Sequence, residues 1–193
     1  MNVLIWATTF GADLWSFAKY LDQQPGVTIK VVMDDPERFR RQGVHDLFPL
    51  DVDLVKRRFW HHALGVPGFD ADITIMDNRT PFLRTAPKAL MLWHGFGWKG
   101  PDSEDDLWWL HRSLRRTWGD ARAPNSDFAW QCFGPWDQKH RTEVTGLHPN
   151  NCHLLGAASH DDLRTPIDRT RAQPYYPFDV ATTPTVLVAP TWH

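Results

Sequence analysis

The sequence is poor in cysteine, in net charge and in long hydrophobic runs. Only Cys132 and Cys152 occur among its 193 residues, without the C-x-x-C spacing of a zinc or redox site or the cysteine density of a secreted disulfide scaffold. The formal net charge of -2 argues against a nucleic-acid partner, because such proteins usually carry a basic excess. Residues 1–15 lack a basic start and an unbroken apolar run, so they predict neither a signal peptide nor a membrane span. These absences favour a protein of the reducing cytoplasm.

Short apolar segments alternate with helical patterns along the chain. Strands are expected at 2–8, 28–34, 70–77, 88–94, 127–133 and 152–156. Helices are expected around 14–21, 51–64, 107–118 and 136–145, where apolar residues recur at helical spacing. This alternation favours one α/β domain with a mainly parallel sheet. Eleven tryptophans are many for this length and indicate large apolar surfaces or sites that bind rings.

The end of the chain has a different composition. Residues 165–184 hold four prolines and are the nearest thing to a linker. They are followed by "TVLVAPTWH" (185–193), an apolar strand with which the sequence stops. We therefore expect a domain over 1–164, an interdomain linker over 165–184, and, over 185–193, the first strand of a second domain that is truncated or absent.

The stretch "ALMLWHGFGWKG" (89–100) sets a hydrophobic strand against polar residues and glycines. In open parallel sheets, ligands bind beyond the carboxyl ends of strands, where His94 would lie. A histidine there can accept a proton at neutral pH, and Lys99 could neutralise a phosphate. The same pattern also fits a strand end in which His94 satisfies a carbonyl, Gly95 and Gly97 form a turn and Lys99 is solvated. The spacing by itself leaves both interpretations open.

Further candidate residues follow the third strand. Asp77, Asn78 and Arg79 end that strand beside the expected cleft and could line a substrate site, although an Asx turn explains them as well. Ser159 is followed by a histidine and an aspartate, but three consecutive residues do not converge as a catalytic triad.

Two clusters combine aromatic and basic residues. Adjacent His61 and His62 would point to different helix faces, which disfavours a metal pair and favours a solvated or partly packed face. With Trp60 and the basic residues 56–58, they could instead rest on anionic lipid. In the second cluster, the Trp108–Trp109 pair precedes three arginines, and core packing is expected to bury at least one of the two indoles.

Two ordered motifs resemble a known family. The segment "DADITIMDNRTPFLRTAPKALMLWHGFGWKG" (70–100) resembles the acceptor-side domain of the CDP-glycerol glycerophosphotransferase family, the teichoic-acid type polymerases and primases. In that family a Trp-His-Gly motif is followed by a lysine at H-G-x-x-x-K spacing, which His94, Gly95 and Lys99 match. The terminal "VLVAPTWH" resembles the strand and turn that open the family's second, nucleotide-binding domain.

The chain departs from the family pattern near both motifs. Phe96 and Gly97 stand where the family usually has threonine and proline after His-Gly. Ala158 and Ser159 stand where proline and arginine are usual, and the last residue is His193 in place of the commoner arginine. These differences bear on donor and acceptor identity more than on the fold.

The resemblance implies the N-terminal half of a GT-B type two-domain transferase: a Rossmann-like parallel sheet with flanking helices, facing a second half that binds the donor. The reaction would move glycerol phosphate, or a related polyol phosphate, from a CDP-activated donor to a hydroxyl of a lipid-linked, membrane-anchored acceptor in cell-wall or capsule polymer synthesis. His94 would be the base, and Lys99 with the amides around Gly95 and Gly97 would bind the phosphoryl group. Neither a metal nor another cofactor is implied. The protein would be cytoplasmic, with a peripheral contact to the inner face of the membrane.

Two other functions stay open. A GT-B sugar transferase with a nucleotide-sugar donor has the same fold, and a non-catalytic module could bind the acceptor or the membrane. If the second half is required, the 193 residues alone should bind acceptor weakly and turn over no donor.

Overall fold

The computed structural model describes residues 1–43, 49–77, 79–92 and 104–162, and beyond these residues 164, 168, 170, 173, 174, 176–184 and 186. Within these ranges, parallel strands form one sheet: β1 (Asn2–Trp6), β2 (Thr28–Met33), β3 (Val52–Lys56), β4 (Ile73–Met76), β5 (Lys88–Met91), β6 (Phe128–Cys132) and β7 (Cys152–Leu154). The helices are α1 (Ala12–Asp22), α2 (Pro36–Arg41), α4 (His61–Leu64), α5 (Glu104–Thr117), α6 (Pro135–Thr145) and α7 (Ala158–Asp162), with a 3-10 turn at Pro149–Asn151.

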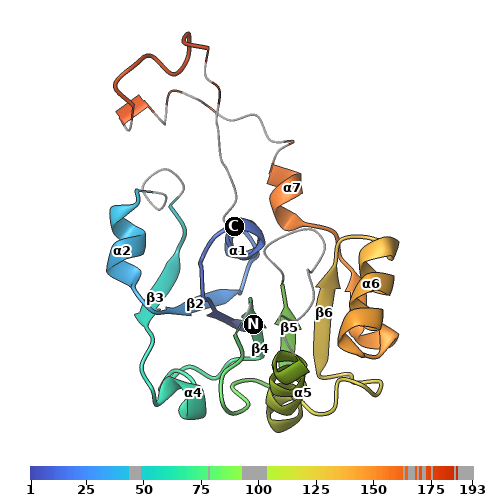
Figure 1. The fold of residues 1–193 in the computed structure, drawn as a ribbon. Coiled ribbons are helices and arrows are strands. Elements are labelled where there is room, and N and C mark those ends of the chain that lie inside the picture. The colour runs from blue at the N-terminus through green and yellow to red at the C-terminus, as the bar shows by residue number, and fades with distance from the viewer. Residues whose placement is uncertain are drawn as a thin grey trace.

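The strand order is β3-β2-β1-β4-β5-β6-β7 (Figure 1). The chain builds outward from β1 to β3, then returns to the other side of β1 and builds outward again to β7. Neighbouring strands are parallel throughout, with registers such as Val3 opposite Ile29 and Ile73. This topology confirms the predicted α/β fold with a Rossmann-like parallel sheet. It also defines a switch point between β1 and β4, the position at which such folds bind ligands.

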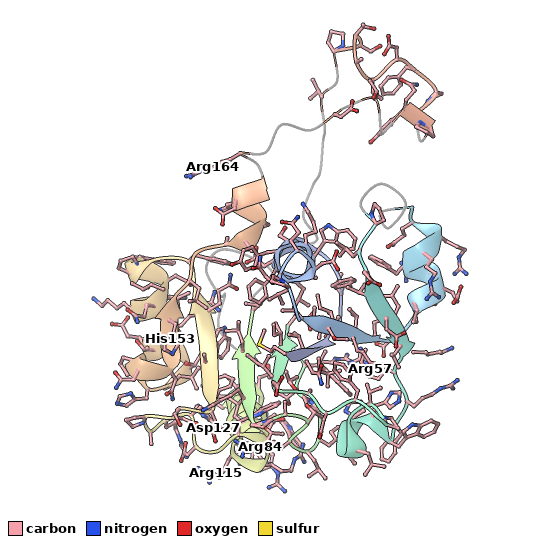
Figure 2. The ribbon with its side chains drawn as sticks, turned by 180° about the vertical axis from the view of Figure 1, so that it is seen from behind. Arg57, Arg84, Arg115, Asp127, His153 and Arg164 are labelled. Atoms are coloured by element: carbon pink, nitrogen blue, oxygen red, sulfur yellow. The ribbon has the colours of Figure 1, made fainter. Side chains whose placement is uncertain are left out.

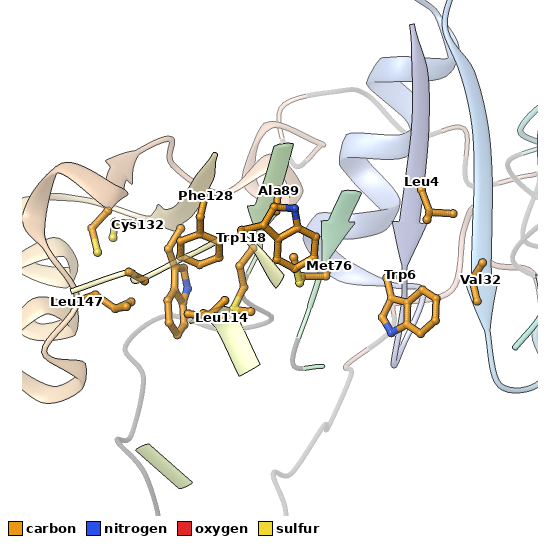
Figure 3. Close-up of a cluster of buried hydrophobic side chains, with 14 of the residues drawn as sticks. Leu4, Trp6, Val32, Met76, Ala89, Leu114, Trp118, Phe128, Cys132 and Leu147 are labelled. Carbon is orange, nitrogen blue, oxygen red and sulfur yellow. The ribbon is translucent and has the colours of Figure 1, made fainter. Parts of the chain in front are cut away.

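Side chains of the central strands are buried on both faces of the sheet, as parallel strands require. On β1, Val3 and Ile5 pack toward α1, whereas Leu4 and Trp6 join the core on the opposite face. Figure 3 shows this second core, in which Trp118, just after α5, lies over the sheet. The buried Trp118 indole donates from Nε1 to the Ala86 carbonyl at 3.0 Å, which satisfies its polar atom.

The prediction of a helix over residues 51–64 is wrong. Residues 52–56 form β3, and only His61–Leu64 is helical. Val52, Val55 and Phe59 fall at helical spacing, but Val52 and Leu54 also alternate with polar residues, as in a strand. Pairing with β2, in which Val31 lies opposite Leu54, decides between the two periods, because Val52 and Leu54 pack in the core beside α1.

The chain beyond α7 bears on the expected domain boundary. The described residues 176–184 lie apart from the sheet (Figure 1). Of the strand expected over 185–193, only Val186 is described, so that prediction lies outside the described residues. Among the helices of the described ranges, none has both the length and the apolar character needed to cross a bilayer.

Candidate functional site

The switch point is closed by a buried carboxylate. Asp77 follows β4 and is 4% exposed. Its Oδ1 accepts a hydrogen bond from the Thr8 amide at 2.9 Å, and its Oδ2 accepts one from the Thr9 amide at 2.9 Å. In dinucleotide-binding Rossmann folds, the turn after the first strand binds a phosphate through backbone amides. Here Asp77 takes the Thr8 and Thr9 amides, so this turn is not available to a phosphate in the same way.

A second polar network holds the start of α1. Asp13, 3% exposed, accepts hydrogen bonds from the backbone amide and the hydroxyl of Ser159, at 2.9 and 2.5 Å. Its other oxygen accepts from Gln131 Nε2 at 2.7 Å, and the same Gln131 amide donates to the Gly156 carbonyl at 2.6 Å. Ser159, one of the departures from the family pattern, therefore ties α7 to α1. Its hydroxyl is engaged with Asp13, which agrees with the rejection of a catalytic triad.

The predicted site residues fall into two groups. His94, Gly95, Gly97, Lys99 and Asn78 lie outside the described residues, and their roles stay predictions.

The flanks of this motif are described. The last described residue before it is Leu92, whose amide donates to the Met76 carbonyl at the end of β4 at 2.8 Å, and the first described residue after it is Glu104, at the start of α5. Of the two described candidates, Asp77 is buried against the loop after β1, and Arg79 lines a cleft nearby.

This cleft lies between α4, the β4–β5 connection and α5. Its volume is about 580 Å³, within the range of about 300–1,000 Å³ typical of small-molecule sites. The lining residues are His62, Arg79, Thr80, Phe82, Met91, Asp106, Trp109, Leu110, Ser113 and Trp130. The buried side chains of Met91 and Trp130 extend from the sheet, and the hydroxyls of Thr80 and Ser113 are hydrogen-bonded to each other. The cleft thus combines apolar walls with a few polar groups, as ligand sites do.

His62 is the ionisable group held most tightly in the cleft. Its ring stacks on Phe82 with centroids 4.2 Å apart and meets the edge of Trp6 at 4.7 Å. The buried Nδ1 of His62 has no hydrogen-bond partner among the described residues. Its neighbour His61 is buried, and its own Nδ1 accepts from the Arg58 amide at 3.1 Å. The two rings therefore have separate surroundings, in keeping with the partly packed face expected from the sequence.

Burial and nearby cations control the protonation of His62. Burial first, and then the Arg57 guanidinium, lower the pKa of His62 below its ordinary value of 6.5. Arg79 adds a smaller effect in the same direction, while Asp34 opposes it. A neutral imidazole at neutral pH can accept a hydrogen bond at one nitrogen and donate one from the other. His62 is therefore suited to bind a hydroxyl group.

Arg57 was not predicted as a site residue, yet it is almost fully buried beside the cleft. Its side chain is 5% exposed, with Nε donating to Asp34 at 2.7 Å, Nη2 donating to the Ala7 carbonyl at 2.9 Å, and the guanidinium 5.3 Å from the Trp6 ring (Figure 2 labels Arg57). The sequence analysis considered His62 and the basic residues 56–58 only as a helix face or a lipid contact, because it assigned residues 51–64 to a helix. A strand over 52–56 would have placed both just beyond its carboxyl end, where sites gather.

The outer side of α5 carries a basic groove of about 860 Å³. It is lined by Arg112, Arg115, Arg116 and Arg122, with Trp108 beside them. Both indoles of the Trp108–Trp109 pair are exposed, at 51% and 58%, so the expectation that the core buries one of them is wrong. The groove is strongly basic, whereas the cleft on the other side of α5 holds one arginine and one aspartate.

A third groove, of about 770 Å³, lies at the amino ends of the strands and is less suited to chemistry. Ion pairs from Lys88 and Arg84 to Asp127 border it, and hydrogen bonds from these two cations lower the pKa of Asp127 to about 2 (Figure 2 labels Arg84 and Asp127). Parallel sheets bind ligands at the opposite edge. The groove is therefore not our candidate site.

The two cysteines are not candidate nucleophiles. Cys132 and Cys152 lie buried on neighbouring strands, β6 and β7. The hydrogen bond to Cys152, together with burial, raises the pKa of Cys132, which keeps it a thiol at neutral pH. The same hydrogen bond lowers the pKa of Cys152, but both side chains are buried in the core, so neither thiol is open to a substrate.

Comparison with known proteins finds a similar α/β fold in solved structures of one enzyme. No family model matches the chain, and no curated protein matches its sequence. Three solved structures of the wall teichoic acid polymerase TagF have a similar fold. A histidine-to-alanine variant has a TM-score of 0.56 at 12% identity. A histidine-to-asparagine variant soaked with CDPG has 0.56 at 11%, and the same variant without the soak has 0.54 at 11%.

Each match covers 90% of this chain but 42% of the TagF chain. The described domain therefore spans less than half the length of that polymerase. At this level of identity the comparison establishes a shared fold, and activity has to be argued from the site.

Proposed function

We propose that this chain is the acceptor-side half of a transferase that moves glycerol phosphate, or a related polyol phosphate, from a CDP-activated donor to a hydroxyl of a lipid-linked acceptor. The fold shared with TagF over 90% of the chain is consistent with this function. The observation that carries the proposal is the sequence motif of His94, Gly95 and Lys99, which follows β5 along the chain.

In this reaction the acceptor hydroxyl attacks the β-phosphorus of the donor. The new bond joins the acceptor oxygen to phosphorus, the bond between that phosphorus and the CMP oxygen breaks, and CMP leaves. His94 takes the proton of the attacking hydroxyl, a role worth about 10²- to 10⁴-fold in rate. Lys99 and the amides around Gly95 and Gly97 stabilise the negative charge on the transferring group.

The three residues after β4 serve the same side of the reaction. Asp77 positions the loop after β1 through the Thr8 and Thr9 amides, and Arg79 lines the cleft that would receive the acceptor. Asn78, between them in the sequence, is proposed to bind the acceptor as well. Because Asp77 takes those amides, the donor phosphates bind elsewhere. This agrees with a donor site on a second, facing domain, as in the GT-B arrangement.

The domain organisation expected from the sequence belongs to this proposal. Residues 1–164 form the acceptor-side domain, 165–184 link it to a nucleotide-binding half, and 185–193 begin that half. A base without a bound and aligned donor supplies little of the proximity that makes transfer fast. We therefore expect the 193-residue chain alone to release no CMP, and measurable release from it would contradict this organisation.

The proposal also includes a peripheral contact with an anionic membrane, on the cytoplasmic side. Large apolar side chains are exposed around α4 and the start of α5; this aromatic patch consists of Phe59, Trp60, Leu64, Phe82, Leu83, Trp108 and Trp109. Two ring contacts lie within it, between Phe59 and Phe82 at 5.9 Å and between Trp108 and Trp109 at 4.7 Å, and Phe82 and Trp109 line the same cleft.

Cations border the same patch. The Arg116 guanidinium lies 5.6 Å from the Phe82 ring, and the Arg112 guanidinium lies 4.9 Å from the Trp108 ring. Aromatic side chains beside arginines suit the interface of an anionic bilayer.

The experiment that tests the function is a donor panel on the full-length gene product with synthetic prenyl-linked acceptors. We expect CMP release from CDP-glycerol or a related CDP-polyol, and only when an acceptor is present. Release of UDP or GDP from a nucleotide sugar would replace the proposal with a GT-B sugar transferase. No release from any donor, with acceptor binding intact, would identify a non-catalytic binding module.

A further inference from the structure

The cleft between α4 and α5 offers more than the proposed reaction requires. Phosphoryl transfer needs a base, cations and an acceptor hydroxyl, whereas this cleft of about 580 Å³ is walled largely by rings. Trp109 is 58% exposed and lines the cleft, so part of its indole can contact a ligand there. Phe82 lines the cleft as well, and the buried Trp130 extends from the sheet. Flat apolar faces of this kind suit a ring-shaped ligand.

The polar groups of the cleft are suited to hydroxyls. His62 is neutral at neutral pH because burial lowers its pKa, and its ring lines the cleft. The paired hydroxyls of Thr80 and Ser113 can each donate or accept. A ligand with several hydroxyls on an apolar ring would match these groups while its flat side rests on Trp109.

Charge favours a neutral ligand over a phosphate here. Arg79 and Asp106 bring opposite charges to the same cleft. The basic groove on the outer side of α5 holds four arginines and a single glutamate, Glu143. A polyanion would be attracted to that groove, and a neutral, hydroxyl-rich ring would be accepted in the cleft.

We propose that the α4–α5 cleft binds one uncharged pyranose ring, which stacks on Trp109 and donates or accepts hydrogen bonds at His62. This binding needs no donor and no second domain. That the ring belongs to the acceptor rests on the proposed function; the binding itself does not.

The test is ligand-observed NMR on the 193-residue chain. The probes are methyl glucoside, N-acetylglucosamine, glycerol and inorganic phosphate. We expect at least one of the two sugars to bind with a Kd of about 1–10 mM, as expected for a small ligand, and glycerol and phosphate to leave the cleft unoccupied.

The variants separate the cleft from the rest of the surface. We expect Trp109→Ala to weaken sugar binding at least five-fold. Trp136→Ala, which removes an equally exposed indole (59%) from α6, is expected to change it less than two-fold. Equal weakening by both variants, binding of phosphate alone, or binding of neither sugar would overturn the proposal.

His62 is tested by a variant that keeps its packing. His62→Phe retains a ring against Phe82 and Trp6, so we expect it to fold, as checked by thermal unfolding, and to lose sugar binding at least five-fold. Unchanged sugar binding in folded His62→Phe would exclude the histidine from the site. Sugar binding without CMP release in the donor panel would refute the transferase and leave the cleft intact. CMP release without sugar binding would support the transferase and refute the proposed sugar site.

Discussion

Asp77 lies buried at the end of β4, and both oxygens of its carboxylate accept hydrogen bonds from the amides of Thr8 and Thr9. A buried carboxylate is stable only when such donors compensate for its lost hydration. Asp13 follows the same rule through Ser159 and Gln131. The buried carboxylates of Asp77 and Asp13 thus stabilise the segments at the carboxyl edge of the sheet.

Asp77→Asn should lower the free energy of unfolding by about 1–3 kcal/mol, because the new amide NH₂ cannot accept from the backbone amides that it faces. Urea unfolding measures the change. Asp53→Asn is the matched control, since its carboxylate is 58% exposed and forms an ion pair with Lys30, and its effect should stay within about 0.5 kcal/mol. Equal effects of the two substitutions would show that the buried hydrogen bonds of Asp77 do not contribute more to stability than an exposed ion pair does.

The protonation of His62 predicts a pH dependence of stability. Its pKa is lower in the folded chain than the 6.5 of an unfolded one, so below pH 6.5 the unfolded state binds more protons. The contribution of neutral His62 is therefore complete above pH 6.5 and is lost as pH falls toward the folded pKa. Thermal unfolding between pH 7.5 and 5 should show a smaller decrease for His62→Phe than for the unchanged chain, and His153→Gln, at an exposed position on β7, serves as the control. A decrease of the same size in His62→Phe would contradict this.

At the scale of helices and strands, the sequence predicts those elements whose hydrophobic pattern fits only one type of secondary structure. The expected strands at 2–8, 28–34, 70–77 and 88–94 match β1, β2, β4 and β5, because each is a compact apolar run bounded by turn residues. Residues 51–64 fit two periods, and the choice depends on pairing with β2, which lies far away in sequence. Local pattern alone could not make that choice.

The same limit of local sequence pattern applies to the prediction of the candidate site. Asp77 and Arg79 could be selected from the sequence because they directly follow a strand. The sequence also singled out His62 and the basic residues 56–58, which include Arg57, but not their place at this edge of the sheet, because that depends on β3. The contacts of His62 with Phe82 and Trp6 join three separate segments, and no spacing rule reveals such contacts.

The tie between α7 and α1 gives a prediction at the same scale. Ser159→Ala removes the hydroxyl that donates to Asp13 and should cost about 1 kcal/mol. Because α7 is short, the loss should appear as local opening, with amide hydrogen exchange over residues 158–162 about five-fold faster. Ser126→Ala, at an exposed position before β6, should leave this exchange unchanged. Unaltered exchange in Ser159→Ala would show that other contacts hold α7.

At the scale of the whole molecule, the sheet has its ring-lined cleft and its aromatic patch on neighbouring surfaces. Phe82 and Trp109 belong to both. If the patch rests on a membrane, the cleft opens close to the lipid surface, where the sugar of a lipid-linked acceptor would be found.

Membrane binding should therefore depend on lipid charge, salt and the patch. We expect the chain to co-sediment with vesicles that contain anionic phospholipid at low salt and to lose this binding as salt increases, because each arginine near the surface contributes about 1 kcal/mol. The double substitution Phe59→Ser and Trp60→Ser should reduce binding several-fold, whereas Trp136→Ser should not. Vesicle binding that is unchanged by the double substitution, or no binding to anionic vesicles, would contradict the proposed contact.

Acceptor-dependent CMP release by the full-length gene product tests the central claim most directly. The measurement compares the unchanged protein with His94→Ala and with His153→Ala, which lies on β7 among the residues of the amino-edge groove. We predict CMP release from CDP-glycerol or a related CDP-polyol only in the presence of a prenyl-linked acceptor. His94→Ala should reduce that release by about 10²- to 10⁴-fold, and His153→Ala should leave it near normal. Near-normal turnover by correctly folded His94→Ala would contradict the account.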